Sequence, residues 1–308
     1  MKIAVMATGG VGGYFGGRLA EANHEVSFIA RGAHLDAIRD KGLKVESLYG
    51  DVHLPDAKAT NHPSDIGPVD VVIFAVKLGD MEEAAKACSP LLGDNTAVIP
   101  FLNGVDAPAT LTRLLGPKYA CGGVAYIFSS MSGPGCIRHV GKFARLVFGE
   151  LDGRPSKRLK AFETACSESG IETSLSDDIM GAVWEKFSVL VPLSGITAGA
   201  RSPVGPIRAE PLGYEIFTAA MMEAISVGKA KGIALPDDLQ GRHIQFFNDL
   251  SDEMKTSMLV DLEAGKALEA PWLSGAVSRM GREVGIATPV NDTLFAVLQP
   301  HVMGAPQK

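Results

Sequence analysis

The sequence predicts an α/β protein with a doubly wound parallel sheet in its N-terminal half and an all-helical C-terminal half. Short β-branched runs alternate with helical patterns in the first half, and the strand signal disappears from about residue 176 onward. The chain has 308 residues, of which 46% are hydrophobic and 21% are charged. At roughly 100 to 200 residues per domain, this length predicts two domains, each with its own core. We expect them at residues 1–175 and 176–308, with the boundary inside the stretch 172–179.

The expected elements follow from the spacing of apolar residues. In the first half, strands rich in β-branched residues are expected at 2–6, 25–30, 69–76, 96–101, 120–127 and 146–148. Helical patterns separate them at 11–22, 34–41, 80–88 and 107–115, which is typical of a parallel sheet covered by helices. In the second half, Gly and Pro separate helical stretches at 177–200, 211–232, 237–266, 272–284 and 291–299.

Charge and hydropathy argue against several classes of partner. The chain carries 29 Lys and Arg against 35 Asp and Glu, a net charge of −6, and no basic cluster. We therefore expect no nucleic-acid binding, because a phosphate backbone needs such a cluster. The longest apolar stretch, 187–200, contains Pro192 and is shorter than the roughly 20 residues that span a membrane. We expect it to be a buried helix, and we expect no targeting segment before the first strand.

The four cysteines do not form a metal-binding pattern. Cys88, Cys121, Cys136 and Cys166 are 33, 15 and 30 residues apart, without a C-x-x-C pair or a His at zinc-ligand spacing. We therefore expect no metal site. Reduced, mostly buried thiols are usual in the cytoplasm, so we expect a cytoplasmic protein.

A glycine-rich turn joins the first predicted strand to the first predicted helix. Strand, turn and helix follow one another in the order that binds a pyrophosphate, because the turn lets the backbone approach phosphates at the helix N-terminus. The expected contacts are Ala7, Thr8, Gly9, Gly10, Val11 and Gly12. Gly9 and Gly12 hold the positions where close approach matters most. The pattern departs from G-x-G-x-x-G at Ala7, whose methyl group predicts a negative φ, and a tight turn without a ligand is the alternative.

The end of the second predicted strand indicates which dinucleotide would bind. An acid there, about 20 residues after the glycines, accepts from a ribose hydroxyl and repels a 2′-phosphate. This chain has Arg31 at that place and no acid. Since the forked guanidinium donors suit a phosphate, the sequence favours NADPH over NADH. The alternative is that Arg31 is a solvated residue at the start of a helix.

Several motifs together resemble the ketopantoate reductase (2-dehydropantoate 2-reductase) family. Their order and spacing are far more specific than the glycines alone, and they cover nearly the whole chain. They are the glycine turn, Arg31, Val76-Lys77, Asn103-Gly104, Trp184-Glu185-Lys186, Ser257-Met258-Leu259 and Glu269. The resemblance implies an N-terminal Rossmann domain, a helical C-terminal domain, and an active site and cofactor in the cleft between them.

The resemblance also implies a reductase that moves hydride from NADPH to the ketone of a 2-oxo acid. Lys186 would protonate the nascent alkoxide, and Asn103 would position that lysine and the substrate. Glu269 would lie near the nicotinamide ribose and the reacting hydroxyl, so that both Asn103 and Glu269 would contact the cofactor. Hydride addition places negative charge on oxygen, which a proton-donating cation stabilises as it forms. Taken singly, Lys186 and Glu269 would be solvated helix residues, and Asn103 would be a turn residue.

Further binding roles come from the same resemblance. Ser257 would bind the substrate carboxylate, Lys77 would help to hold the cofactor, and the backbone near Ile127 would line the nicotinamide pocket. The implied partner is a small-molecule 2-oxo acid, and the sequence is compatible with a homodimer.

The family pattern breaks in the substrate pocket. The family has Asn residues four and eight positions after the catalytic lysine, where this chain has Leu190 and Ser194. A further family Asn falls near Val204. A site built around a substrate hydroxyl loses discrimination when its partners become apolar, so Leu190 and Val204 favour a substrate with more hydrocarbon. Three hypotheses stay open: a ketopantoate reductase, the same chemistry on a more apolar 2-oxo acid or another carbonyl, and a non-catalytic dinucleotide-binding sensor.

Overall fold

The computed structural model describes residues 1–305, and contacts divide the chain into two compact units. The first unit comprises Met1–Leu102 and Asp106–Ile179, and the second comprises Asn103–Val105 and the chain from Met180 onward. The division therefore falls a few residues beyond the expected position after residue 175. The loop 103–105 follows a strand of the first unit, yet it packs with the second. Sequence position alone does not predict such an assignment, because contacts decide it.

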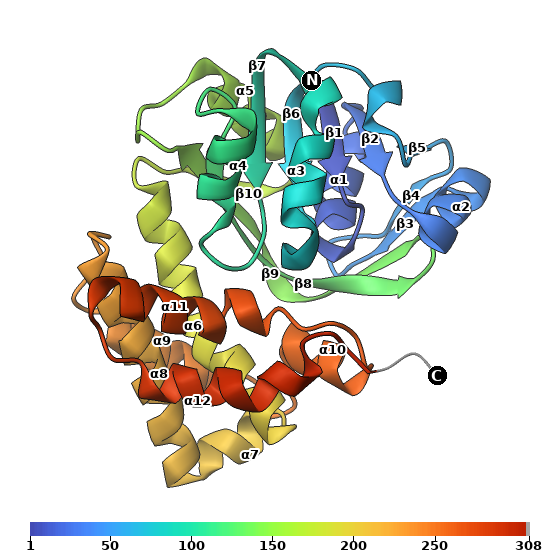
Figure 1. Ribbon diagram of the computed structural model, residues 1–308. Coiled ribbons are helices and arrows are strands. Elements are labelled where there is room, and N and C mark those ends of the chain that lie inside the picture. The colour runs from blue at the N-terminus through green and yellow to red at the C-terminus, as the bar shows by residue number, and fades with distance from the viewer. Residues whose placement is uncertain (306–308) are drawn as a thin grey trace. The chain divides into compact units, whose positions relative to one another are not determined.

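A five-stranded parallel sheet forms the centre of the first unit, as predicted. Its strand order is β5-β2-β1-β6-β7, and β1, β2, β6 and β7 run side by side in Figure 1. Met6, the last residue of β1, pairs with Ile29 on one side and with Phe74 on the other, so the strands end at one edge. The strands are β1 (Lys2–Met6), β2 (Glu25–Ile29), β5 (Lys58–Thr60), β6 (Val69–Phe74) and β7 (Leu92–Pro100).

A second sheet in the first unit differs from the prediction. The strands expected at 120–127 and 146–148 belong to two long strands that pair antiparallel with each other, not to the parallel sheet. A short turn joins them, and antiparallel pairing needs no more than that. The sheet has the order β10-β9-β3-β4, with β8 also paired to β9. Its strands are β3 (Leu43–Glu46), β4 (Val52–Leu54), β8 (Cys121–Gly133), β9 (Cys136–Glu150) and β10 (Glu172–Leu175).

Helix α1 (Gly10–Glu21) packs against both sheets, and its glycines make this contact. A Cβ atom on Gly16 would lie 2.6 Å from the side chain of Val5 in β1. On the other side of the helix, a Cβ atom on Gly17 would lie 2.9 Å from the side chain of Val45 in β3. These two glycines in the middle of the helix are therefore required by packing against the two sheets.

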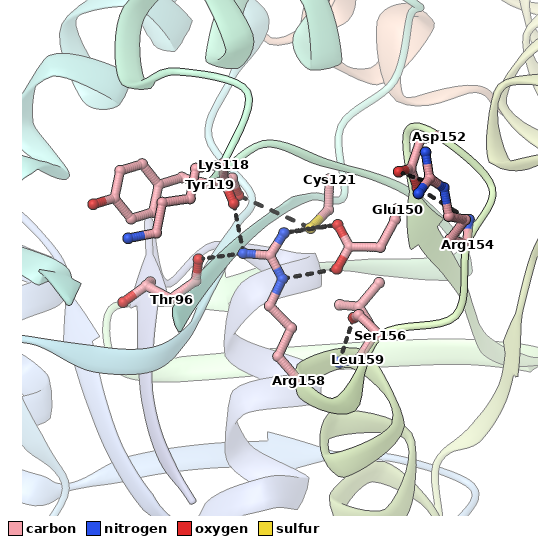
Figure 2. Close-up of polar contacts among 10 residues, drawn as sticks. All are labelled: Thr96, Lys118, Tyr119, Cys121, Glu150, Asp152, Arg154, Ser156, Arg158 and Leu159. Atoms are coloured by element: carbon pink, nitrogen blue, oxygen red, sulfur yellow. Dashed lines mark hydrogen bonds and ion pairs between the residues drawn. The ribbon is translucent and has the colours of Figure 1, made fainter. Parts of the chain in front are cut away.

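The other helices of the first unit are α2 (Gly32–Lys41), α3 (Met81–Ala87), α4 (Ala107–Leu115) and α5 (Lys157–Glu168). The sequence reasoning predicted the first three and missed α5. Arg158 anchors this helix: its Nε and Nη2 atoms donate to the Glu150 carboxylate at 2.8 and 2.7 Å (Figure 2). Its Nη1 atom donates to the carbonyl oxygens of Thr96 at 2.9 Å and Lys118 at 2.7 Å. One guanidinium thus joins α5 to both sheets of the unit.

The described part of the second unit contains helices and no strand. The predicted helix at 237–266 is wrong, because this stretch forms two helices separated by the segment 250–256. The separation involves a distant residue: Arg208 donates to the carbonyl oxygens of Phe247, Asn248 and Leu250 at the end of the first of the two helices. The helices are α6 (Ile179–Ala200), α7 (Val204–Ala209), α8 (Pro211–Ala230), α9 (Leu239–Asp249), α10 (Ser257–Glu263), α11 (Ser274–Val284) and α12 (Pro289–Leu298). Among these, α7 was not predicted.

Helix α6 is the one described helix long and apolar enough to cross a membrane by length and composition alone. Its most apolar window is 72% buried within the protein. A core helix passes the same test, and this degree of burial is what a core helix has.

Candidate functional site in two units

The turn after β1 adopts a left-handed conformation at Ala7, whose φ is +71°. The expectation of a negative φ at Ala7 is therefore wrong: the backbone keeps the conformation of a glycine turn in spite of the methyl group. Thr8 is held by two hydrogen bonds of 3.0 Å, from its N–H and its hydroxyl group to the carbonyl oxygen of Ile29. These contacts tie the turn to the end of β2 and so hold the strained residue in place.

His34 also supports this turn, and the sequence reasoning did not identify it. The backbone N–H of Gly135 donates to Nδ1 of His34 at 2.9 Å. The imidazole proton is therefore on Nε2, which donates to the carbonyl oxygen of Thr8 at 2.7 Å. Burial lowers the pKa of His34, and the bond to Thr8 partly opposes that shift. No sequence pattern marks this role, because its partners lie 26 and 101 positions away.

The three glycines of the turn have different surroundings. A Cβ atom on Gly9 would meet nothing within 4 Å, so the start of α1 is open to a ligand there. A Cβ atom on Gly12 would lie 2.3 Å from the carbonyl oxygen of Ala7, and one on Gly10 would lie 2.4 Å from that of Ser129. Gly10 and Gly12 are thus needed for packing, while Gly9 and the N–H groups at the helix start, with Val11 among them, suit an anionic group.

The other expected cofactor residues follow strand ends in the first unit. Arg31 comes two positions after β2, where its guanidinium is exposed and forms an ion pair of 3.3 Å with Glu83. Lys77 is exposed three positions after β6, the neighbour of β1. Ile127 lies at an irregularity in the pairing of β8 with β9, two residues before Ser129 and its contact with Gly10.

A cluster of polar residues around Lys186 lies within the second unit. Lys186 lies on α6, and its Nζ atom donates to Oδ1 of Asn103 at 3.1 Å. Burial lowers the pKa of Lys186 to about 8, and the negative charge of Glu269 opposes part of that shift. Glu269 is half-buried at the start of a short 3₁₀ turn, Ala270–Trp272. The structure thus brings together three residues that are far apart in the sequence and were expected to act together.

The remaining substrate residues differ in their exposure. Leu190 is half-buried one helical turn after Lys186, and Ser257 is exposed as the first residue of α10. Ser194 and Val204 are buried, with 1% and 0% of their surface exposed. The full burial of Val204 weakens its use as evidence for an apolar pocket. The expectation of a substrate with more hydrocarbon therefore depends on Leu190.

The described residues offer no metal centre, and neither Cys88 nor Cys121 is a reactive thiol. No group of three or more His, Cys, Asp or Glu side chains in residues 1–305 could hold a metal ion. Cys88 and Cys121 are buried, and burial raises the pKa of each thiol to about 12. Neither thiol is suited to act as a nucleophile at neutral pH.

A glycine turn on parallel strands and a helical unit that holds a buried lysine are the features that an oxidoreductase with a nicotinamide cofactor would use. Comparison with known proteins agrees with this class. The family model described as "Ketopantoate reductase PanE/ApbA" matches residues 3–153, and the model of its C-terminal part matches residues 178–302. The chain therefore belongs to the ketopantoate reductase family.

The similarity to known proteins extends over nearly the whole chain. An uncharacterized oxidoreductase of Bacillus subtilis is 31% identical, with 97% of this chain and 98% of the relative covered. A 2-dehydropantoate 2-reductase of Mesorhizobium japonicum is 32% identical, with 97% of each chain covered. The crystal structure of a ketopantoate reductase from Ralstonia eutropha has a TM-score of 0.90 and 32% identity, with 98% of each chain covered. The chain is thus similar in length and fold to enzymes that act on CH–OH groups.

Proposed function

We propose that this protein uses NADPH to reduce a 2-oxo acid to the 2-hydroxy acid, as 2-dehydropantoate 2-reductases do with ketopantoate. In that case it would act in pantothenate biosynthesis in the cytoplasm. The observation that carries the proposal is the contact of Lys186 with Asn103, together with the pKa of Lys186 near 8. An acid with such a pKa is charged at neutral pH and can still give up its proton readily.

The residues of the second unit account for the proton transfer. A bound nicotinamide would supply hydride to C2 of the 2-oxo acid, and the carbonyl oxygen would then gain negative charge. Lys186 donates a proton from Nζ to that oxygen, which completes the alcohol. Asn103 accepts from Nζ and so orients the ammonium group, while the charge of Glu269 keeps it protonated. Ser257 would bind the carboxylate with its exposed hydroxyl group.

The first unit supplies groups that fit a phosphorylated dinucleotide. The open space at Gly9 and the N–H groups at the start of α1 suit the pyrophosphate. Arg31 suits the 2′-phosphate of NADPH, since its guanidinium is exposed and is held by one surface ion pair with Glu83. Such a pair contributes about 0 to 1 kcal/mol, so a phosphate can replace it readily.

A second candidate substrate is a 2-oxo acid with an apolar side chain. Leu190 is one helical turn from Lys186 and keeps part of its surface exposed, so it lies near whatever Lys186 protonates. Burying the ketopantoate hydroxyl against leucine without a partner would cost about 1 to 3 kcal/mol.

The test is NADPH oxidation with ketopantoate, 2-oxoisovalerate and 2-oxoisocaproate as substrates, compared by kcat/KM. Turnover of any of them with NADPH supports the proposed reaction. NADPH binding without turnover of any 2-oxo acid would instead contradict the proposed reaction and favour either another carbonyl substrate or a sensor.

A preference for the aliphatic acids over ketopantoate would assign the apolar substrate class. Leu190→Asn should then raise kcat/KM for ketopantoate, relative to kcat/KM for the aliphatic acids, by about ten- to a hundredfold. Leu190→Met should leave this ratio nearly unchanged. A wild-type preference for ketopantoate of about tenfold or more would contradict the apolar assignment.

A further inference from the structure

A pair of buried threonines joins helix α6 to the start of helix α10. The hydroxyl oxygens of Thr197 on α6 and Thr256 before α10 are 2.7 Å apart. Both side chains are buried, with 0% and 3% of their surface exposed. Two hydroxyl groups that meet inside a helical core are costly unless each hydrogen and each oxygen has a partner.

The donors and acceptors of this pair can be assigned. Thr197 donates its hydroxyl hydrogen to the carbonyl oxygen of Leu193 at 2.7 Å. The hydrogen between the two threonines therefore comes from Thr256, which donates to Thr197. The Thr256 oxygen in turn accepts from the backbone N–H of Leu259 at 3.3 Å, as the N-cap of α10. The result is a continuous chain of hydrogen bonds from the backbone of α6 to the backbone of α10.

Backbone contacts hold the segment before α10 to the neighbouring helix. The N–H of Val204 donates to the carbonyl oxygen of Met254 at 3.0 Å, and the N–H of Gly205 donates to that of Asp252 at 2.9 Å. These bonds fasten the segment to the start of α7. The threonine pair, by contrast, fastens it directly to α6, the helix that carries Lys186.

The two threonines stand on the elements that carry two residues of the proposed site, Lys186 and Ser257. Thr197 follows Lys186 by eleven residues, which is about three helical turns, so the two side chains project from nearly the same face of α6. Ser257 follows Thr256 directly. The threonine pair thus fixes the start of α10, where Ser257 stands, against α6, the helix that carries Lys186.

We propose that Thr197 and Thr256 are positioning residues that set the place of Ser257, and with it the substrate carboxylate, relative to Lys186. This inference rests on the proposed function. Neither threonine touches the substrate in this account, and both act through the position of α10. Because a shift of about 1 Å between reacting groups can cost a large factor in rate, the loss of one hydroxyl should affect use of the 2-oxo acid more than cofactor binding.

The test compares Thr197→Val, Thr197→Ser and wild type. Valine keeps the shape and removes the hydroxyl, so we expect the KM for the 2-oxo acid to rise about tenfold while the NADPH Kd stays within about twofold. Serine keeps the hydroxyl and should restore KM to within about twofold of wild type. The matched control is Thr218→Val on α8, which loses a similar bond, from its hydroxyl to Tyr214, without any link to α10. It should leave KM unchanged.

Other outcomes overturn the proposal. A lower Tm for Thr197→Val with an unchanged KM would show that the pair only stabilises the fold. Equal increases in the KM for the 2-oxo acid and in the Kd for NADPH would show that the substitution disrupts the protein in general. If wild type reduces a 2-oxo acid and Thr197→Val does so with an unchanged KM, only the positioning role is refuted. If wild type turns over no 2-oxo acid, the proposed function is refuted, and this inference with it.

Discussion

The Nζ atom of Lys186 donates a 3.1 Å hydrogen bond to the amide oxygen of Asn103, a residue 83 positions earlier in the sequence. This bond restrains the ammonium group, which a long lysine side chain would otherwise leave free to take many rotamers. Burial and the nearby charge of Glu269 act on the same group in opposite directions and leave its pKa near 8. The proposed proton donor is thus both oriented and adjusted in acidity by residues outside its own helix.

The rate of reduction should depend on the protonation of Lys186. As the pH rises through about 8, Lys186 loses the proton that the reaction needs, so kcat/KM for reduction should fall while the reverse oxidation gains. Lys186→Ala should lower turnover by roughly 10²- to 10⁴-fold and leave NADPH affinity intact. Lys229→Ala, a change in a lysine paired with Asp237 at the surface, is the control. Near-normal turnover of Lys186→Ala would remove this residue from the mechanism.

Replacing Glu269 with Gln should move the alkaline limit of activity. The carboxylate raises the pKa of Lys186 against the larger effect of burial, so removing its charge lowers that pKa further. The fall in kcat/KM should therefore begin at a lower pH than in wild type. A pH profile of Glu269→Gln with the same alkaline limb as wild type would contradict the electrostatic link between these two groups.

Arg31 should determine the choice between NADPH and NADH. Arg31→Ala should weaken NADPH binding by about ten- to a hundredfold, the worth of hydrogen bonds to a charged group, and leave NADH binding nearly unchanged. Arg39→Ala, an exposed change on the same helix whose side chain reaches the carbonyl oxygen of Ala59, is the matched control. Fluorescence titration of both cofactors measures the difference. Equal losses for the two cofactors would show that Arg31 does not bind the 2′-phosphate.

Ala7→Gly should stabilise the protein. At φ +71° the Cβ atom of Ala7 costs roughly 1 to 2 kcal/mol, and glycine removes that cost while it adds entropy to the unfolded chain. We expect a net gain of about 1 kcal/mol in the free energy of unfolding, measured by urea denaturation. Ala20→Gly, inside α1, should instead destabilise by roughly 0.5 to 1 kcal/mol. A destabilised Ala7→Gly variant would mean that the methyl group packs better than the conformation suggests.

Arg158→Ala should destabilise the first unit by roughly 3 kcal/mol, because it leaves the Glu150 carboxylate without its ion pair in a mostly buried place. Arg154, which pairs with Asp152 in Figure 2 and is 85% exposed, is the matched control, and Arg154→Ala should change stability by less than about 0.5 kcal/mol. Similar losses from both substitutions would contradict a special role for Arg158.

The same ion pair should depend on pH. Burial alone would raise the pKa of Glu150, but hydrogen bonds from Arg158 and Ser156 outweigh it, so the pKa is lowered. A lowered pKa means that the contribution is complete above the pKa of the unfolded carboxyl and is lost as the pH falls through the folded value. The stability difference between wild type and Arg158→Ala should therefore shrink in acid.

Local features of the chain were predictable from sequence. The strand, glycine turn and helix of residues 2–21 are adjacent in the chain, so composition and order are enough to predict them. The helical second half was predicted for the same reason. The antiparallel pairing of β8 and β9 was not, because the predicted strands at 120–127 and 146–148 covered only the two ends of this hairpin that lie farthest from its turn. The break between α9 and α10 was missed because it involves Arg208, which lies on another helix and donates to carbonyl oxygens at the end of the first of them.

The candidate site also has some features that the sequence predicts and others that only the tertiary structure decides. By itself the sequence determined which residue types are present: a glycine turn after the first strand, an arginine after the second strand, and a lysine, an asparagine and a glutamate at the family's spacing. Only the tertiary structure decided that Ala7 accepts a positive φ, that Lys186 bonds to Asn103 with a pKa near 8, and that Thr197 meets Thr256. The physical reason is that acidity, strain and hydrogen bonding depend on the surroundings that distant segments provide, and those surroundings exist only after the chain has packed.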